Sequence, residues 1–210
     1  QSAENGTVAA TWITARFVGL LLAALAWKRR ASWPPATLAV IRRAGDTWES
    51  RSVSGSDDFH LNHIVRAKDG VLYLAAEAGR LYRSEDMGRT WLALPSPYQG
   101  SFFGLLPLSD GALLAFGLRG HLFRSPDQGR TWQRIDTGTE ATLTSAIELG
   151  PGRFVVAGLA GTLLWSDGAA GAMRKQDLPD RKGIVALARS TEGSLLLFGE
   201  GGVQQLEIAR

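Results

Sequence analysis

The sequence predicts an all-β fold assembled from repeated four-stranded units, and three observations support this prediction. From about Asp69 onward, residues recur at a spacing of 41 positions, as Gly70 and Gly111 do. Glycine accounts for 25 of the 210 residues, well above its average share of about 7%. The segments between the glycines are short and rich in strand-forming residues, and no segment after Trp48 has helical periodicity.

Two ladders of glycines mark the hairpin turns inside each unit. Tight hairpins need residues with positive φ, a conformation that glycine adopts without steric cost. The first ladder, after the first strand of each unit, is Gly70, Gly111, Gly152 and Gly193. The second ladder, between the second and third strands, is Gly79, Gly120, Gly161 and Gly202. A helical repeat of similar length would not place a glycine turn about every ten residues.

Each unit contains four predicted strands, which we call strands A to D. In the first complete unit they run over residues 61–66, 71–76, 80–83 and 90–94. A 41-residue unit with four short strands has the size of one propeller blade. We therefore expect a β-propeller of 41-residue, four-stranded blades, in a partial or small ring of about four to five blades.

The two ends of the repeat region suggest how the ring is completed. The last unit has strands A to C between Ile184 and Ile208, whereas Thr47–Val53 has the character of an isolated strand D. Pairing of these two segments would give four blades and remove an exposed edge. A fifth blade built from residues 8–53 and an incomplete piece of a larger ring are the alternatives.

The N-terminal segment differs from the rest, and we place the domain boundary between residues 1–44 and 45–210. Val8–Trp27 is mostly apolar and long enough to cross a bilayer, but it contains Arg16, a costly residue at mid-membrane. The positive charges Lys28–Arg30 follow this run, whereas a secretory leader carries them before it. A leader, a membrane anchor and an extra blade all remain open for residues 1–44.

Two segments, 84–91 and 125–132, match the pattern Ser-x-Asp-x-Gly-x-Thr-Trp in full. This pattern is the Asp-box, a local motif of the turn between strands C and D. Its Ser and Asp side chains can bind backbone N–H groups, its glycine takes the left-handed conformation, and its tryptophan packs between blades. The residues expected in these structural roles are Ser84, Asp86, Gly88, Thr90, Trp91, Ser125, Asp127, Gly129, Thr131 and Trp132. Residues 166–173 form a degraded third copy.

With these motifs and the segments Ala76–Ser84 and Ser96–Gly104, the chain resembles the photosystem II stability/assembly factor-like family of Asp-box (BNR) repeat β-propellers. The resemblance covers about residues 45–206 and is greater to the bacterial branch, whose members are typically exported. Photosynthetic members are chaperone-like scaffolds of the thylakoid lumen that bind a reaction-centre protein and have seven blades. The resemblance therefore implies an exported scaffold, and this chain has fewer blades than that ring.

Composition excludes several classes of function. The chain has no cysteine, which removes thiol nucleophiles, disulfides and thiolate metal sites. The formal charge is +3 and the pI about 9.6, a basic excess too small to indicate nucleic-acid binding. A cluster of Asp57, Asp58, His60 and His63 looks metal-like, but three-residue spacing in a strand places the two imidazoles on opposite faces. We expect no metal, no cofactor and no nucleic-acid partner.

Asp-boxes also occur in sialidases, so a glycosidase-like hydrolase is the alternative function. Sialidase chemistry needs a tyrosine nucleophile and three arginines that clamp a carboxylate. Tyr73 and Tyr82 occupy strand positions where sister units have Leu or Phe, which leaves Tyr98 as the loop tyrosine. The conceivable arginine triad is Arg80, Arg119 and Arg181. Because such arginines arise by chance in a basic chain, we expect no enzymatic activity.

The most promising surface is the one formed by the D–A and B–C turns, which in propellers lie on one face around the central channel. We call it the turn face; the Asp-boxes lie on the opposite face. The residues expected to contact a partner are Glu77, Arg80, Tyr98, Gln99, Arg119, His121, Glu140, Arg181 and Lys182, with Glu200 beside them. Tyr98 would be the aromatic anchor.

The sequence therefore predicts a non-catalytic scaffold or assembly factor that binds a protein partner through the turn face. An exposed segment of a membrane protein fits this expectation. The expected location is extracytoplasmic, periplasmic or membrane-associated, with the cytoplasm as the alternative.

Overall fold

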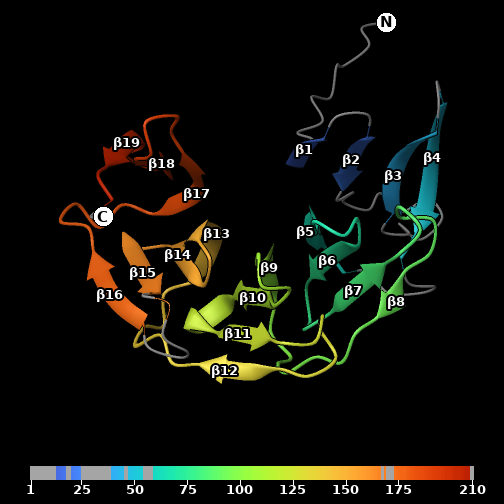
Figure 1. The fold of residues 1–210 in the computed structure, drawn as a ribbon, viewed down its shortest axis with the longest axis horizontal. Helices are drawn as coiled ribbons and strands as arrows, with labels where there is room; N and C mark the ends of the chain where they lie inside the picture. The colour runs from blue at the N-terminus through green and yellow to red at the C-terminus, as the bar shows by residue number, and fades with distance from the viewer. Residues whose placement is uncertain are drawn as a thin grey trace, which may run out of the picture.

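A computed structural model describes residues 13–17, 20–24, 39–44, 47–53, 59–166, 168 and 173–208. Within these ranges the chain forms five antiparallel sheets that follow one another along an incomplete ring (Figure 1). The only helical element there is a short 3-10 turn, η1 (Leu118–Gly120). The expected all-β propeller fold is confirmed, as a partial ring.

Each sheet is one blade, numbered 1 to 5 in chain order. Blade 1 contains β1 (Ile13–Phe17), β2 (Leu20–Ala24), β3 (Ala39–Ala44) and β4 (Thr47–Ser52). Blade 2 contains β5 (Leu61–Arg66), β6 (Leu72–Ala76), β7 (Leu81–Ser84) and β8 (Leu92–Ala93). Blade 3 contains β9 (Phe102–Pro107), β10 (Leu113–Gly117), β11 (Leu122–Ser125) and β12 (Gln133–Ile135).

The last two blades follow the same order. Blade 4 contains β13 (Leu143–Gly150), β14 (Arg153–Gly158), β15 (Thr162–Ser166) and β16 (Met173–Asp177). Blade 5 contains β17 (Ile184–Arg189), β18 (Leu195–Gly199) and β19 (Gly202–Leu206). Strands pair in sequence order within every blade, as the four-strand repeat predicts.

The pairing of β4 differs from one sequence-based expectation. The segment Thr47–Val53 was expected as a strand D that completes the last unit, but β4 pairs with β3 in register from Ala44↔Thr47 to Ala39↔Ser52. It therefore completes a blade with its own sequence neighbours, which is the fifth-blade alternative. A short hairpin is the simplest connection between two antiparallel strands, and here β3 and β4 form one, so that β4 does not pair with the distant last unit.

Strand D of blade 2 is shorter than expected. The sequence predicted residues 90–94, whereas β8 contains only Leu92 and Ala93. The N–H and hydroxyl of Thr90 are both bound to Asp86, so this residue belongs to the turn and not to the ladder. The strand therefore begins later than predicted, because hydrogen bonds of the polar turn motif hold the residue at its expected start.

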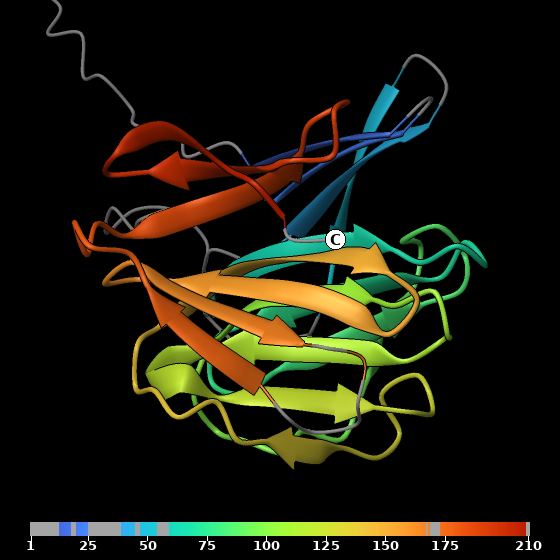
Figure 2. The same cartoon turned by 60° about the vertical axis from the view of Figure 1, so that its left-hand side comes forward.

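The core lies between neighbouring blades, whose sheets stack face to face (Figure 2). Alternate residues of a strand point to opposite faces, and in blade 2 Leu72 and Leu74 pack with Val40 of blade 1. Tyr73 and Ala75 instead pack with blade 3. Every residue of β6 and β10 is buried, because these second strands are covered on both faces.

Several sequence-based expectations fall on the N-terminal part. Half of the apolar run Val8–Trp27 lies outside the described residues, as do Lys28–Arg30, whereas β1 and β2 fall within the run. No helix in the described ranges is long and apolar enough to span a membrane. The domain boundary at residue 45 stays a prediction.

Candidate binding surface

The turn face is built on the second glycine ladder. All four glycines of that ladder, including Gly79 and Gly120, have positive φ between 67° and 76°, as the sequence predicted. Gly120 also lies directly against the Thr139 carbonyl oxygen, so a side chain there would strike the backbone of the following D–A loop. Gly79, Gly120 and Gly161 each bring a B–C turn against the following D–A loop, so that both turns share one surface, whereas Gly202 has open space around it.

An aromatic stack joins two blades on this face. The Tyr98 ring, from the loop between β8 and β9, stacks on His121 before β11 with centroids 4.0 Å apart and an interplanar angle of 14°. Phe102 and Phe123 lie beneath the pair at centroid distances of 6.0 and 6.3 Å from Tyr98. Phe102 is fully buried, as expected, so the stack is a partly exposed extension of the core. Stacked rings of this kind are rigid and offer an aromatic surface at low entropic cost.

Backbone contacts fix both rings of the stack. The Ser96 hydroxyl donates to the Tyr98 carbonyl at 2.7 Å and closes the loop around the tyrosine. His121 Nδ1 lies 3.0 Å from the Leu118 carbonyl oxygen, a contact in which the Nδ1–H donates. The sequence predicted Tyr98 as the aromatic anchor of a contact, and in the structure its ring is stacked on His121.

Two of the expected contact residues flank the stack in sequence, since Gln99 follows Tyr98 and Arg119 lies two residues before His121. Arg119 sits at the tip of its B–C turn with φ of 53°, where the sister turns of blades 2 and 4 have alanine with φ of 52° and 55°. The left-handed conformation therefore belongs to the turn, and the exposed cation is what distinguishes blade 3. Arg119, Gln99 and Glu140 of the next D–A loop are exposed, and none of them forms an ion pair with any residue in the described ranges.

Two acidic residues of the turn face, Glu77 and Glu200, form hydrogen bonds within the protein. Glu77 Oε2 accepts the His60 N–H at 3.1 Å and lies 2.8 Å from His60 Nδ1. Glu200, three repeats later (200 − 77 = 123), accepts the Gly183 N–H at 2.8 Å in the same way. These hydrogen bonds lower the pKa of Glu77, against the opposing effect of burial. Both carboxylates tie a B–C turn to the start of strand A; their equivalence in the repeat was the sequence signal for this role.

The remaining basic residues of the turn face are spread along the ring. The Arg80 guanidinium lies 4.3 Å from the Phe59 ring centroid. Arg181 approaches Asp177 at 3.8 Å, and the Lys182 side chain is exposed beside it. The structure therefore brings together Tyr98, His121, Arg119 and Gln99 between blades 2 and 3, and it places Arg181 and Lys182 between blades 4 and 5.

The opposite face carries the two C–D turns, 84–91 and 125–132. In the first, the Ser84 hydroxyl accepts the Gly88 N–H at 2.8 Å, and Asp86 Oδ1 accepts the Thr90 N–H at 2.9 Å. The second repeats these bonds at 2.6 and 2.8 Å through Ser125 and Asp127. Gly88 and Gly129 have φ of 80° and 92°. The expected local roles of serine, aspartate and glycine are confirmed.

These hydrogen bonds set the ionisation of the two aspartates. The Thr131 N–H and hydroxyl lower the pKa of Asp127 to about 2. The equivalent bonds from Thr90 hold the pKa of Asp86 even further below its usual range. Both carboxylates are therefore charged throughout the neutral range and act as acceptors only, which suits a structural turn and not a general acid.

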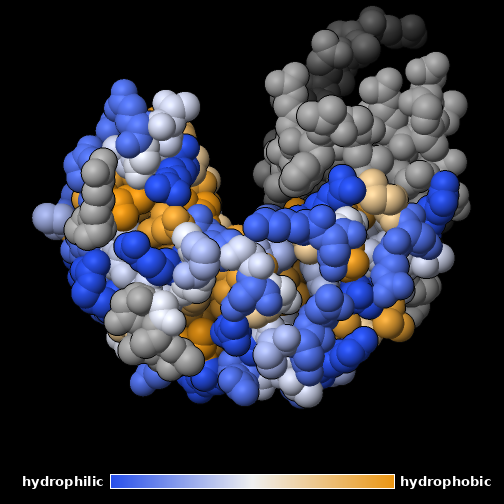
Figure 3. All heavy atoms as spheres, viewed as in Figure 1, coloured by the Kyte–Doolittle hydropathy of each residue, from blue (hydrophilic) through white to orange (hydrophobic). Residues whose placement is uncertain are grey.

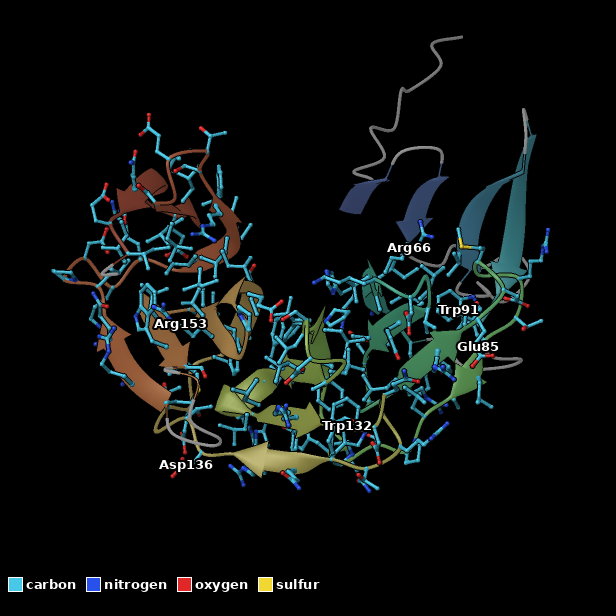
Figure 4. All side chains as sticks on the ribbon, viewed as in Figure 1. Arg66, Glu85, Trp91, Trp132, Asp136 and Arg153 are labelled. Atoms are coloured by element: carbon cyan, nitrogen blue, oxygen red, sulfur yellow. The ribbon has the colours of Figure 1, made fainter. Side chains whose placement is uncertain are left out.

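The two tryptophans pack between blades, as expected, but they are only partly buried (Figure 4). Trp132 lies against the core shared by blades 2 and 3, and its indole N–H donates to the Pro95 carbonyl at 2.9 Å. Trp91 packs against the core shared by blades 1 and 2. Each tryptophan therefore locks its C–D turn to the preceding blade.

The histidine cluster is divided by the fold. His60 is exposed and bound to Glu77, whereas His63 is partly buried, and Asp57 and Asp58 lie outside the described residues. Burial lowers the pKa of His63 to about 4 and keeps the imidazole neutral, so that its Nδ1 accepts the Leu105 N–H at 3.2 Å. His63 thus joins two blades and is unavailable as a ligand.

The sequence prediction missed a series of hydrogen bonds between neighbouring blades, of which the bond to His63 is one. Asn62 donates to the Phe102 carbonyl at 2.8 Å, and two repeats later (144 − 62 = 82) Thr144 donates to the Ile184 carbonyl at 2.5 Å. Ser145 likewise accepts the Leu187 N–H at 3.1 Å, as His63 does for Leu105. Polar residues at one point of strand A therefore connect blade 2 to blade 3 and blade 4 to blade 5, which are alternate junctions of the ring. The 82-residue spacing was the available signal.

Comparison with solved structures agrees with the fold. A structure of YCF48 bound to D1 peptide superposes with a TM-score of 0.69 at 13% identity, over 93% of this chain and 62% of that chain. YCF48 from Cyanidioschyzon merolae gives 0.64 at 9% identity, over 88% of this chain and 64% of that one. Virginiamycin B lyase from Staphylococcus aureus gives 0.72 at 12% identity, over 94% of this chain and 69% of that chain.

No protein-family model and no curated protein sequence matches the chain. The chain spans less than two thirds of the length of both YCF48 structures. At these identities the likeness concerns the fold, which a peptide-bound protein and a lyase share. The conclusion from fold and comparison together is that this chain is a β-propeller.

Proposed function

We propose that the protein is a non-catalytic propeller scaffold that binds a protein partner through its turn face. The observation that supports this most is the stacked pair of Tyr98 and His121, held between two blades with the exposed side chains of Gln99 and Arg119 beside it. A rigid aromatic platform ringed by polar side chains is the usual composition of a binding hot spot. One protein of the same fold, YCF48, has a bound D1 peptide.

The tyrosines favour a scaffold over a sialidase-like enzyme. Tyr73 and Tyr82 are buried, with exposures of 2% and 4%. The remaining tyrosine, Tyr98, stacks on a histidine, whereas a nucleophilic tyrosine needs a supporting glutamate. The three arginines of the conceivable triad come from separate blades, and Arg181 approaches Asp177. The fold itself does not decide between a scaffold and an enzyme, because a lyase shares it. That this protein is not an enzyme is therefore part of the proposal.

The resemblance to the photosystem II stability/assembly factor-like family extends the proposal. By that resemblance the protein is an extracytoplasmic member of the bacterial branch, and its partner is a membrane protein with an exposed segment. The two C–D turns are then the Asp-boxes of that family, which mark the face opposite the binding surface.

Affinity capture with matched variants tests the surface. The turn-face variant combines Tyr98→Ala, Arg119→Ala and His121→Ala, and the control combines Arg89→Ala and Arg130→Ala on the exposed C–D turns. Both variants remove exposed positive charge, but from opposite faces. Bait immobilised through its C-terminus is exposed to detergent-solubilised membranes and periplasm of the source cells. We expect wild type and control to capture the same protein and the turn-face variant to lose it.

The captured protein is then titrated against each variant by calorimetry. A loss of affinity of about 100-fold in the turn-face variant is expected if the stack is a hot spot. Equal affinity of the turn-face variant and wild type would reject this surface. Turnover of a fluorogenic sialoside by wild type and its loss in Tyr98→Phe would instead support the glycosidase alternative.

A further inference from the structure

A cavity lies on the face opposite the turn face. It has a volume of about 130 Å³ and opens where the A–B turns of blades 2 and 3 meet the C–D turn of blade 3. Its polar lining comes from Lys68, Asp69, Tyr73, Ser109 and Gln128, and its apolar lining includes Pro107 and Leu113. We call it the junction cavity. Its volume exceeds the share of several water molecules, which is enough for a small solute.

The repeat shows what the same positions do one junction further on. Between blades 3 and 4, Glu148 accepts the Ser109 N–H at 3.0 Å and the Ser109 hydroxyl at 2.6 Å. In the same turn Asp110 pairs with Arg124 at 2.6 Å. Both polar positions of that A–B turn are therefore satisfied within the protein.

Between blades 2 and 3, the A–B turn lacks both of these partners, the carboxylate of Glu148 and the guanidinium of Arg124. Lys68 is equivalent to Ser109, but the residue equivalent to Glu148 is Pro107, which has no carboxylate. Asp69 is equivalent to Asp110, and its Oδ1 accepts only the Val71 N–H at 3.1 Å. Within the described ranges, neither Lys68 nor Asp69 has an ion-pair partner.

The arginine that could have neutralised Asp69 is engaged elsewhere. Arg83, equivalent to Arg124, pairs with Glu85 at 2.5 Å and donates to Gln128 Oε1 at 3.1 Å. Its own charge is thus compensated by Glu85. This leaves one ammonium and one carboxylate, on adjacent residues of one turn, at the edge of the junction cavity.

Inside the cavity a hydroxyl replaces an aliphatic side chain. Tyr73 occupies the position where blades 3 to 5 have Leu114, Val155 and Leu196. Burial raises the pKa of Tyr73, an effect that Arg83 opposes, so the phenol is protonated at neutral pH and is able to donate. A hydroxyl at this position, where the sister blades have aliphatic side chains, places a polar group in the lining of the cavity and favours a polar occupant beside it.

We propose that the junction cavity binds a small free α-amino acid, whose carboxylate pairs with Lys68 and whose ammonium pairs with Asp69. The two opposite charges, on adjacent residues, match the two ends of a zwitterion, whereas a simple anion or cation would meet one repulsive neighbour. The apolar walls and the Tyr73 hydroxyl then contact the side chain. This site is independent of the turn face, because the A–B and C–D turns lie at one end of the strands and the B–C and D–A turns of the turn face lie at the other.

Amide NMR titration of the whole chain with L-alanine tests the site, with acetate and ethylammonium as probes that each carry one of its charges. A ligand of this size is expected to bind with a dissociation constant of about 1 to 10 mM. The expected result is shifts of the amides of residues 67–73 and 107–113 with L-alanine and much weaker shifts with either single ion. Absence of saturable shifts in these residues, or equal affinity for acetate or ethylammonium, would overturn the proposal.

Three variants complete the test. Asp69→Asn keeps an oxygen for the Val71 N–H but removes the charge, and Lys68→Gln removes the exposed ammonium. Each is expected to weaken L-alanine binding by about tenfold or more. Glu192→Gln, at the equivalent position in the A–B turn of blade 5 (192 − 69 = 123), removes an exposed carboxylate away from the cavity and should leave the dissociation constant unchanged. Binding that survives both Asp69→Asn and Lys68→Gln, or that is lost equally in Glu192→Gln, would contradict the assigned site.

Discussion

At the scale of single residues, the two C–D turns show how few side chains specify a conformation. Asp127 binds both the N–H and the hydroxyl of Thr131, and Ser125 binds the Gly129 N–H. These groups satisfy a turn that has no sheet partner. The pattern was visible in the sequence because all of its contacts are local, within four residues.

The depressed pKa of Asp127 predicts a specific acid response. Its pKa is about 2 in the folded protein, against an unfolded value of about 3.9. The stability that it contributes is present above the unfolded value and is lost as the pH falls through the folded value. Asp127→Asn should therefore flatten the dependence of stability on pH between about 4 and 2.

Urea unfolding at a series of pH values measures this response. Wild type is expected to lose midpoint concentration faster than Asp127→Asn as the pH falls through that window. Glu140→Gln is the matched control, because it removes an exposed carboxylate without an ion pair in the described ranges. Parallel curves for wild type and Asp127→Asn would show that the hydrogen bonds of Asp127 do not persist in solution.

At the scale of elements, the glycine ladders carry the hairpins, and they differ in how closely their neighbours approach. Gly120 has φ of 67° and lies against the Thr139 carbonyl, whereas Gly138, in the D–A loop and outside the ladders, has φ of 59° and open space around it. Both would strain an alanine by about 1 to 2 kcal/mol through the backbone alone. Only Gly120 adds a collision with backbone atoms.

Gly120→Ala should therefore destabilise the protein by about 3 kcal/mol or more, and Gly138→Ala by about 1 kcal/mol. The free energy of unfolding from urea denaturation compares the two. Equal losses would mean that the B–C turn relaxes around the new methyl group and does not hold the following D–A loop.

The sequence predicted these elements well where the determinants are local and poorly where they are not. The repeat located strands A to C of blade 2 to within one or two residues, because alternation and turn glycines are local signals. It overestimated β8, since the hydrogen bonds of Thr90 decide that boundary. It left open whether β4 pairs with a distant strand or with its sequence neighbour β3, because sequence patterns do not specify which strand a neighbour pairs with.

The candidate site shows the same division. Sequence placed Tyr98 and His121 on one face, because both lie in turns at the same end of the blades. The parallel stack of their rings depends on two separate blades approaching each other, which no local pattern contains. The structural role of Glu77 emerged only when the hydrogen bond of Glu200 repeated it.

At the scale of the whole molecule, the ring is a series of sheets that hold each other through shared cores. Hydrophobic side chains lie between the blades, while a mainly hydrophilic surface covers the described part of the face seen in Figure 3. The outermost strands contribute little to these cores; both residues of β8 are exposed, whereas all of β10 is buried. Stability should therefore fall from the second strands to the outer strands.

Hydrogen exchange of the free protein tests this gradient. Amides of β6 and β10 are expected to exchange only through global unfolding, and those of β8 through openings at least about 2 kcal/mol cheaper. Uniform protection across a blade would indicate that each blade opens as one unit.

The central claim is that the turn face, and not the face of the C–D turns, contacts the partner. Hydrogen–deuterium exchange of the complex with the captured protein measures this directly. The account predicts slowed exchange in residues 96–101 and 117–121 on complex formation, with segments 84–91 and 125–132 unchanged. Protection confined to the latter two segments would contradict the proposed binding surface.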